Sequence, residues 1–511
     1  MKKIIYICAF LLVGGLFSSC ANFLEETSPD KLSSDTFWRN KEDAEKGISA
    51  VYSQLEYAID TYGFAEVKWP VEAYREDIVS LGRDAMNYPN WVELANFTFT
   101  NGNSQVYAYW WNNYRGISYA NQVIEKVPGI PEGMIEEDER KNLINEARFL
   151  RGYYYLKLQL NWEKIVIRDK YITSQADMNK GLSPRTASWD FLIADFEAAT
   201  ALPAAYDLDN TGRATSGAAY AYLAYAYLTR AYEEEDKKTE YLEKAVQAFD
   251  KVVGYELVSD FQSMFKGLKT NTSESIFELQ FTMNDANGAF YQTCMHKWIG
   301  CSEVGGWDEI LPSEMLMREF KKEGKIAQGN LYDKRLYHTI YFKDDYFNGG
   351  PGTLFGENTY DEVFGADNTK AAFHKYLPST WDGMNYWSCA INIPLMRYAN
   401  VLLMKAEALN ELGRTAEAIP LINQVREVHG DMPPMQGSSQ ADVRAQIEHE
   451  RMLEFPLENL RWYDLRRWGK LEEAMQKANR KNFVLDKHAF YPIQLKEINA
   501  NDALKKGSVT Q

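Results

Sequence analysis

Apolar residues recur with the period of an α-helix along most of this chain. The recurrence predicts helices near residues 41–58, 107–127, 137–161, 189–202, 214–233, 239–254, 397–412, 415–428 and 441–478. Most of these segments follow one another in twos. The pattern therefore predicts a mainly α-helical fold that is built from helix pairs.

Some of the predicted pairs have the spacing of the tetratricopeptide repeat. The clearest pair has repeat positions at Leu402, Ala406, Leu409, Ala418, Ile422 and Val425. A second pair fits Leu223, Ala224, Tyr227, Ala245, Phe249 and Val252 if its turn is lengthened. A third begins at Gly152 and Tyr155 and resumes after an insertion at Trp189. Stacked pairs bury a continuous core between neighbours, although spacing alone also allows a generic helical bundle.

Two long segments, 60–106 and 259–395, interrupt the helical pattern. They are rich in Gly, Asn, Pro and aromatic residues, which predicts loops with short strands such as 276–281. Loops of this length in a compact protein usually carry function. We expect a single domain over 41–511, with a scaffold formed mainly by 41–58, 107–254 and 397–428. The two interrupting segments would then form an irregular, loop-rich ligand-binding part.

The first twenty residues have the pattern of a bacterial lipoprotein signal. Lys2 and Lys3 precede an apolar run, and the small pair Ser18 and Ser19 stands directly before Cys20. The run is too short to span a bilayer stably, so we expect removal of residues 1–19 and lipid attachment to Cys20. Residues 20–40 would form the lipidated tether. The alternative is an ordinary signal peptide in which Cys20 is incidental.

Charge and cysteine content narrow the function classes. The net charge of −16 argues against nucleic acid or an anionic lipid surface as a partner. Beyond Cys8 and Cys20, the cysteines are Cys294, Cys301 and Cys389, without a CxxC pair, and the six histidines form no HExxH motif. We therefore expect no zinc site and no cofactor. A structural calcium ion and the pairing of these three cysteines stay open.

Several further motifs follow one another in a fixed order. They are Trp111–Asn121, Glu146–Tyr154, Arg397–Leu409, Glu450–Phe455, Glu458–Gly469 and Phe490–Ile498. Together with Cys20 and the Phe-Leu-Glu-Glu stretch after it, they resemble the SusD/RagB family, the lipid-anchored nutrient-binding proteins of the Bacteroidetes outer membrane. The resemblance implies about four tetratricopeptide units, a ligand site on the cell surface, no catalysis, and a partner in a SusC-like TonB-dependent transporter.

Aromatic residues in the loops are the main candidates for ligand contact. Flat rings cover the C–H face of a sugar, while polar side chains at the rim bind its hydroxyls. Segment 83–91 combines both kinds of residue, and the resemblance favours Tyr88 and Trp91, with Asp77, Arg83 and Asn90 as hydrogen-bonding candidates. The second irregular segment adds Trp298, Tyr346, Trp381 and Trp387. Each of these aromatic residues could instead pin its loop to the scaffold.

Other aromatic and charged residues are interpreted as structural. Trp307 precedes an apolar segment and suits a packing anchor, and the helical residues Trp110, Trp111, Trp462 and Trp468 suit the core. The charged run is interpreted as a set of ion pairs, with an arginine clamp for a carboxylate ligand as the alternative. It comprises Glu450, Arg451, Glu454, Glu458, Arg461, Asp464, Arg466 and Arg467.

The favoured function is capture of oligosaccharides at the cell surface and their delivery to the transporter. Peptide binding on the same architecture is the first alternative, and it would use main-chain hydrogen bonds and pockets. A helical glycoside hydrolase would need two carboxylates about 5–10 Å apart across the scissile bond. A scaffold for protein partners is the usual role of helix-pair repeats, but it leaves the aromatic loops unexplained.

Overall fold

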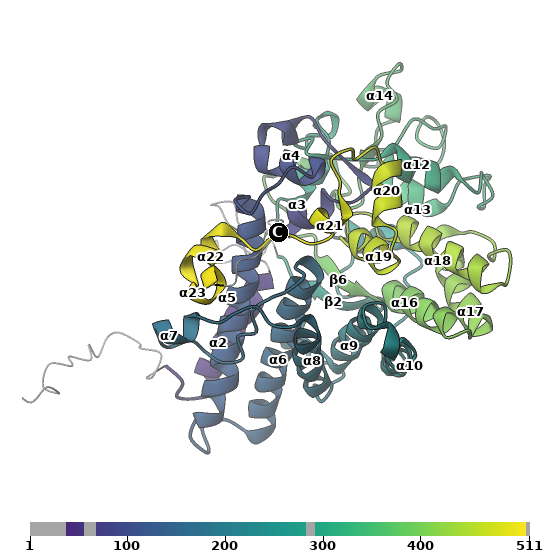
Figure 1. Cartoon of the computed structure of the whole chain (residues 1–511). Helices are drawn as coiled ribbons and strands as arrows, with labels where there is room; N and C mark the ends of the chain where they lie inside the picture. The colour runs from purple at the N-terminus through teal and green to yellow at the C-terminus, as the bar shows by residue number, and fades with distance from the viewer. Residues whose placement is uncertain (1–36, 56–67, 283–291, 507–511) are drawn as a thin grey trace, which may run out of the picture.

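A stack of long helices runs through the computed structural model, which describes residues 37–55, 68–282 and 292–506. Its helices are α2 (Lys41–Tyr52), α5 (Ser104–Lys126), α6 (Glu137–Asn161), α8 (Arg185–Ala199), α9 (Ser216–Ala231), α10 (Lys238–Phe249), α16 (Tyr398–Glu411) and α17 (Thr415–Val425). Each helix packs against the next one in this order (Figure 1). The predicted fold of stacked helix pairs is confirmed. The predicted signal sequence and Cys20 lie outside the described residues.

The segment predicted as one helix over 441–478 forms three. They are α18 (Gln440–Glu454), α19 (Arg461–Arg467) and α20 (Leu471–Lys477). Leu457 and Asn459 separate the first two with φ angles of 66° and 58°, and Gly469, with φ of 68°, separates the last two. Left-handed residues end a helix, so the prediction of a continuous helix is wrong.

Short elements make up the rest of the described chain. The helices are α3 (Lys68–Ala73), α4 (Pro89–Asn96), α7 (Gln175–Met178), α11 (Met295–Ile299), α12 (Glu314–Lys321), α13 (Lys334–Thr339), α14 (Tyr360–Phe364), α15 (Trp381–Asn385), α21 (Leu485–His488), α22 (Leu495–Ala500) and α23 (Asp502–Lys506). The strands are β1 (Val79–Leu81), β2 (Ser275–Leu279), β3 (Ile310–Pro312), β4 (Ile340–Tyr341), β5 (Ala372–Phe373) and β6 (Ile393–Arg397). They pair as antiparallel ribbons β1–β3, β2–β6 and β4–β5.

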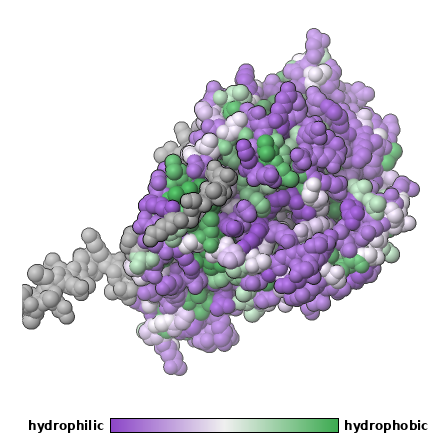
Figure 2. Space-filling view, viewed as in Figure 1, coloured by the Kyte–Doolittle hydropathy of each residue, from purple (hydrophilic) through white to green (hydrophobic). Residues whose placement is uncertain are grey.

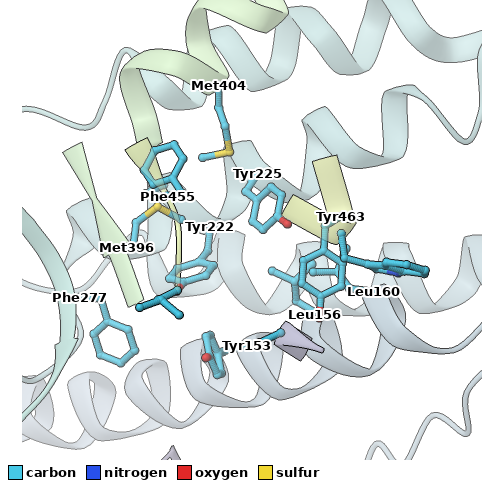
Figure 3. Close-up of a cluster of buried hydrophobic side chains, with 14 of the residues drawn as sticks. Tyr153, Leu156, Leu160, Tyr222, Tyr225, Phe277, Met396, Met404, Phe455 and Tyr463 are labelled. Atoms are coloured by element: carbon cyan, nitrogen blue, oxygen red, sulfur yellow. The ribbon is translucent and has the colours of Figure 1, made fainter. Parts of the chain in front are cut away.

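An aromatic core joins the ribbon β2–β6 to the helical stack. Figure 3 shows Phe277 of β2 near Tyr153 of α6 and Tyr222 of α9, with Met396 and Phe455 beside them. The ring of Tyr222 lies 5.4 Å from that of Tyr153, and the ring of Phe277 lies 6.3 Å from Tyr153. Buried contacts of this kind seat the second irregular segment on the helices at both of its ends.

A buried network of charges holds the C-terminal helices. Arg397 binds Glu454 at 2.9 Å and Glu458 at 2.7 Å, and Arg335 binds Glu450 at 2.6 Å. All of these side chains are almost fully removed from solvent. Arg451, Arg461 and Arg467 likewise bind carboxylates, and Arg466 donates to the carbonyl of Leu160. The structural interpretation of the charged run is therefore confirmed, because its members are bound to other residues of the protein.

The tryptophans assigned to the core divide into two groups. Trp110 and Trp462 are buried, whereas Trp111 is 40% exposed. The assignment of Trp111 to the core is wrong, because a helix of the stack keeps an outer face and Trp111 lies on that face of α5, with Arg115 over its ring at 5.1 Å.

Candidate functional site

Five aromatic rings from four separate loops and short helices lie in one row, which we call the aromatic row. In order they are Tyr88, Trp91, Trp298, Trp307 and Trp387. Successive ring centroids are 4.1, 4.5, 5.8 and 5.2 Å apart. These are distances of direct ring contact, so the row is a continuous series of packed rings.

The two ends of the aromatic row face solvent. Tyr88 is 44% exposed and Trp387 is 56% exposed, while Trp91 and Trp298 in the middle are buried. Tyr386, at 61%, extends the exposed end. The space-filling view shows a largely hydrophilic surface with scattered hydrophobic patches (Figure 2). Exposed rings on buried rings give flat, rigid platforms for a ligand.

The ribbon β1–β3 brings the two irregular segments together. Ser80 pairs with Leu311, and beyond the ribbon the amide of Gly82 donates to the carbonyl of Glu309 at 2.8 Å. A Cβ on Gly82 would lie 1.9 Å from the carbonyl oxygen of Asp308. Only glycine allows this approach, and it holds the segment with Tyr88 and Trp91 against the one with Trp298 and Trp307.

Lys297 connects the loops that carry the aromatic row. Its buried ammonium donates to the carbonyl of Gly305 at 3.0 Å and to the carbonyl of Met384. Its own carbonyl accepts from the amide of Trp307 at 2.7 Å. Burial lowers the pKa of Lys297. One side chain thus connects α11, the Trp307 loop and α15, which precedes Trp387.

Two ionisable groups near the row are shifted toward their neutral forms. Burial, together with the nearby charges of Asp84 and Asp308, raises the pKa of Glu309 to about 8. Burial lowers the pKa of His296 to about 4, while its Nε2 lies 3.0 Å from the carbonyl of Tyr386. Glu309 and His296 are therefore largely neutral at pH 7.

The predicted polar residues of the first segment have different surroundings. Asp77 is buried, and both of its oxygens accept from Arg461 at 2.9 Å. Asn90 lies next to Trp91 and donates to the hydroxyl of Ser104 at 2.6 Å. Arg83 is exposed at the start of the turn that leads to Tyr88. Arg83 and Asn90 thus flank the row, whereas Asp77 is engaged by a buried guanidinium.

Two predicted aromatic residues have contacts outside the row. Trp381 donates to Asn358 at 2.8 Å and packs on Phe355 at 4.3 Å. Tyr346 packs on Tyr337 at 4.3 Å. These contacts pin loops, which is the alternative that the sequence left open for each residue.

Two residues of the aromatic row and its exposed end, Trp307 and Tyr386, were not predicted as ligand contacts from the sequence. Trp307, interpreted as a packing anchor, contacts both Trp298 and Trp387. Tyr386, which directly precedes Trp387, is not among the predicted ligand-binding residues. Two adjacent aromatic residues in a polar loop would have been enough to predict it. The position of Trp307 could not be predicted, because it depends on the pairing of distant loops.

Two buried groups of side chains have ligand atoms close enough for a metal ion. They are Glu274, His429 and Glu454, and Glu323, His449 and Glu450. Arginine already occupies each group: Arg397 lies 2.5 Å from Glu274, and Arg426 lies 2.5 Å from Glu450. Because a guanidinium competes with a cation for these carboxylates, the groups fit ion pairs better than a metal centre.

The three cysteines of the second irregular segment are buried thiols in this structure. Burial raises the pKa of Cys301 to about 12.

Among the described helices, none has both the length and the apolarity that a membrane crossing requires.

Two family models match this chain in succession. The model described as "Starch-binding associating with outer membrane" matches residues 22–228, and the model described as "SusD family" matches residues 273–508. A SusD-like protein P38 of Formosa agariphila is 26% identical over 94% of both chains. The relatives therefore match the chain over nearly its full length.

Solved structures share the fold. A SusD superfamily protein from Bacteroides vulgatus is 25% identical, covers 92% of this chain and 98% of its own, and superposes with a TM-score of 0.78. A structure described as a laminarin-binding SusD-like protein is 23% identical, covers 91% of this chain and 98% of its own, and gives 0.73. With both halves of the chain matched, this chain belongs to the SusD/RagB family of binding proteins, which are not enzymes.

Proposed function

We propose that this protein binds oligosaccharides on the aromatic row at the cell surface and delivers them to a TonB-dependent outer-membrane transporter. The single observation that carries the proposal is the unbroken contact from Tyr88 to Trp387. Exposed Tyr and Trp rings cover the apolar faces of sugar rings. The laminarin-binding description of one structural relative supports the same ligand class.

Polar side chains beside the row supply partners for sugar hydroxyls. Arg83 and Asn87 are exposed next to Tyr88, and Asn385 is exposed next to Tyr386 and Trp387. A guanidinium donates to hydroxyls, and an amide both donates and accepts. The rings would hold the sugar by its faces, and these groups would select the arrangement of its hydroxyls.

The family and the proposed lipid anchor support delivery of the ligand rather than its chemical conversion. The lipid on Cys20 would hold the protein at the outer membrane, which agrees with the outer-membrane association named for its family. Release to a SusC-like transporter then requires moderate affinity, because a ligand that never dissociates cannot be imported.

Affinity electrophoresis of the protein beginning after Cys20 tests the ligand class. Gels would contain neutral polysaccharides, laminarin included, and parallel titrations would use a panel of extended peptides. We expect retardation of the wild type by at least one glycan, and weaker retardation of Trp387→Ala by the same glycan. Binding of peptides without any glycan would contradict the proposal and favour the peptide-binding alternative.

Co-purification tests the delivery step. The gene for the full-length protein would be expressed in its native host with an affinity tag, and membranes would be solubilised in mild detergent. We expect a TonB-dependent barrel protein to co-purify. The same tag on a Cys20→Ala variant should lose both membrane attachment and the barrel protein.

A further inference from the structure

Two pockets that adjoin each other lie beside the elements that carry the aromatic row but are not lined by its rings. The first encloses about 830 Å³ between α12, α18, α19 and α20, and the second encloses about 840 Å³ on the other side of α12. Ser80, Glu314 and Arg318 line both. Figure 1 shows α12, α18, α19 and α20 gathered on one side of the molecule. We call the combined feature the basic groove. None of the five rings of the row belongs to its described lining.

The basic groove has the opposite charge balance to the whole chain. Its lining contains nine lysine and arginine residues and five carboxylates, whereas the chain has 56 Lys and Arg against 72 Asp and Glu. The nine are Arg318, Lys321, Lys322, Lys343, Lys370, Arg461, Lys470, Lys477 and Arg480. Two of the nine are paired with carboxylates outside the lining, Lys343 with Asp361 and Lys370 with Glu303 and Asp308, so the positive excess rests on the other seven. Since salt screens charges beyond about 8 Å, a ligand in the groove responds to these local charges.

Two of the cations are not neutralised by an ion pair among the described residues. Arg480 donates to the carbonyls of Ala95 at 3.0 Å and Val79 at 2.8 Å. Lys321 lies over the ring of Phe342 at 4.7 Å. The main-chain carbonyls and the ring orient these groups but carry no net negative charge, and the carboxylates of Asp77 and Asp344 act on Arg480 and Lys321 without a direct ion pair.

Other cations in the groove have weakly held partners. Arg318 pairs with Glu314, and their side chains are 78% and 88% exposed. Lys477 pairs with Glu473 at a similarly exposed position. Exposed pairs contribute only about 0–1 kcal/mol, so these cations can exchange their carboxylate for a ligand anion at little cost.

The groove also has apolar surface between its charges. Met315, Met452 and Leu465 line the first pocket, and Leu311 and Phe342 line the second. Each pocket has the volume of a small-molecule site. Concave apolar surface beside cations fits a ring with an apolar face and an anionic substituent better than it fits a flat protein interface.

The groove adjoins the elements that carry the aromatic row. Arg480 holds α4, which bears Trp91, through the carbonyl of Ala95. Lys370 binds Asp308 at 2.9 Å, directly after Trp307. A ligand in the groove would therefore lie close to one on the row.

From this geometry we propose that the basic groove is a second binding site, for oligosaccharides that bear carboxylate or sulfate groups. The site does not depend on what the aromatic row binds. Carboxylate and sulfate are both bound by lysine and arginine through charge-assisted hydrogen bonds, and titrations with each kind of ligand separate them.

Isothermal titration of the protein beginning after Cys20 tests this site. The probes are oligogalacturonate, a sulfated galactan oligomer and a neutral glucan of equal length. The groove variant is Lys321→Gln, Lys322→Gln and Lys477→Gln together. Its matched control is Lys46→Gln, Lys141→Gln and Lys251→Gln, which removes the same charge from exposed positions outside the groove.

We expect one anionic probe to bind at least tenfold tighter than the neutral glucan to the wild type, with affinity that falls as NaCl rises. The groove variant should weaken that binding at least tenfold, whereas the control and Trp387→Ala should change it less than twofold. The proposal would be overturned if the groove variant and the control lost the same affinity for the anionic probe. It would also be overturned if only Trp387→Ala lost that affinity. Tighter binding of poly-glutamate than of both anionic oligosaccharides would overturn the ligand class.

Discussion

The ring of Trp91 lies 4.5 Å from the ring of Trp298, although the two residues belong to different irregular segments of the chain. Both are buried, and each supports an exposed ring further along the aromatic row, Tyr88 on one side and, through Trp307, Trp387 on the other. The contact makes two loop regions into one surface. Binding at either exposed end should therefore depend on the pairing of both segments.

Lys297→Met should loosen the loops that carry the exposed half of the row. The substitution removes the hydrogen bonds to the carbonyls of Gly305 and Met384. We expect a loss of about 1–3 kcal/mol in unfolding free energy and faster amide exchange in 301–307 and 381–388. Lys251→Met, at an exposed position, is the control. Unchanged exchange in both loops would show that Lys297 does not hold them.

Gly306→Ala should displace the Trp307 loop. A Cβ at this position would lie 1.9 Å from the carbonyl oxygen of Gly300, and backbone atoms cannot yield as a flexible side chain can. We expect a lower thermal midpoint and weaker glycan binding. Gly129→Ala, whose Cβ would meet nothing within 4 Å, should change neither. Equal melting curves for the two variants would contradict this account.

Glu454→Gln should strongly destabilise the fold. Glu454 binds Arg397 at 2.9 Å and Arg335 at 3.1 Å in a region closed to solvent. Removal of this charge breaks two buried ion pairs and leaves Arg397 and Arg335 to other partners such as Glu458 and Glu450, which costs about 3–5 kcal/mol. Glu473→Gln, in the exposed pair with Lys477, should cost less than about 1 kcal/mol in the same denaturant titration. A cost for Glu454→Gln as small as that of the control would refute the structural role of the network.

Stability should fall as pH rises through about 9, because of His429. Burial opposes its protonation, but Glu454 and Glu274 outweigh burial and raise its pKa to about 9. The folded state therefore holds a proton that the unfolded chain releases near pH 6.5. This contribution is complete below pH 6.5 and is lost through pH 9.

Chemical denaturation at pH 6, 8 and 10 measures this loss. His429→Gln should reduce the decline, and His449, whose pKa is also raised to about 9, should account for a further part of it. An equally steep decline in the wild type and in a double variant of both histidines would assign the pH dependence to other groups.

The helical stack was predictable because its signal is local. Periodicity located Ala406 and Ala418 at the contact of α16 with α17, and both are fully buried there. Periodicity alone does not tell which face of a helix stays open, which is why Trp111 was misassigned. The break after α18 was missed because it depends on Leu457, whose left-handed conformation is unusual for its residue type.

The loops were predictable in composition but not in arrangement. The aromatic content of both segments pointed to Tyr88, Trp91, Trp298 and Trp387, and the structure brings these four together. Trp307, which connects them, could be placed only once β1 and β3 were known to pair, and a three-residue pairing between distant segments leaves no periodic signal in the sequence.

Isothermal titration of a retained neutral oligosaccharide into Trp387→Ala and Trp111→Ala tests the central claim most directly. Both residues are exposed tryptophans, at 56% and 40%, but only Trp387 belongs to the aromatic row. The account predicts about two- to tenfold weaker binding for Trp387→Ala, since one stacked ring contributes about 0.5–1.5 kcal/mol, and wild-type binding for Trp111→Ala. Wild-type affinity in Trp387→Ala, or equal losses in both variants, would contradict it.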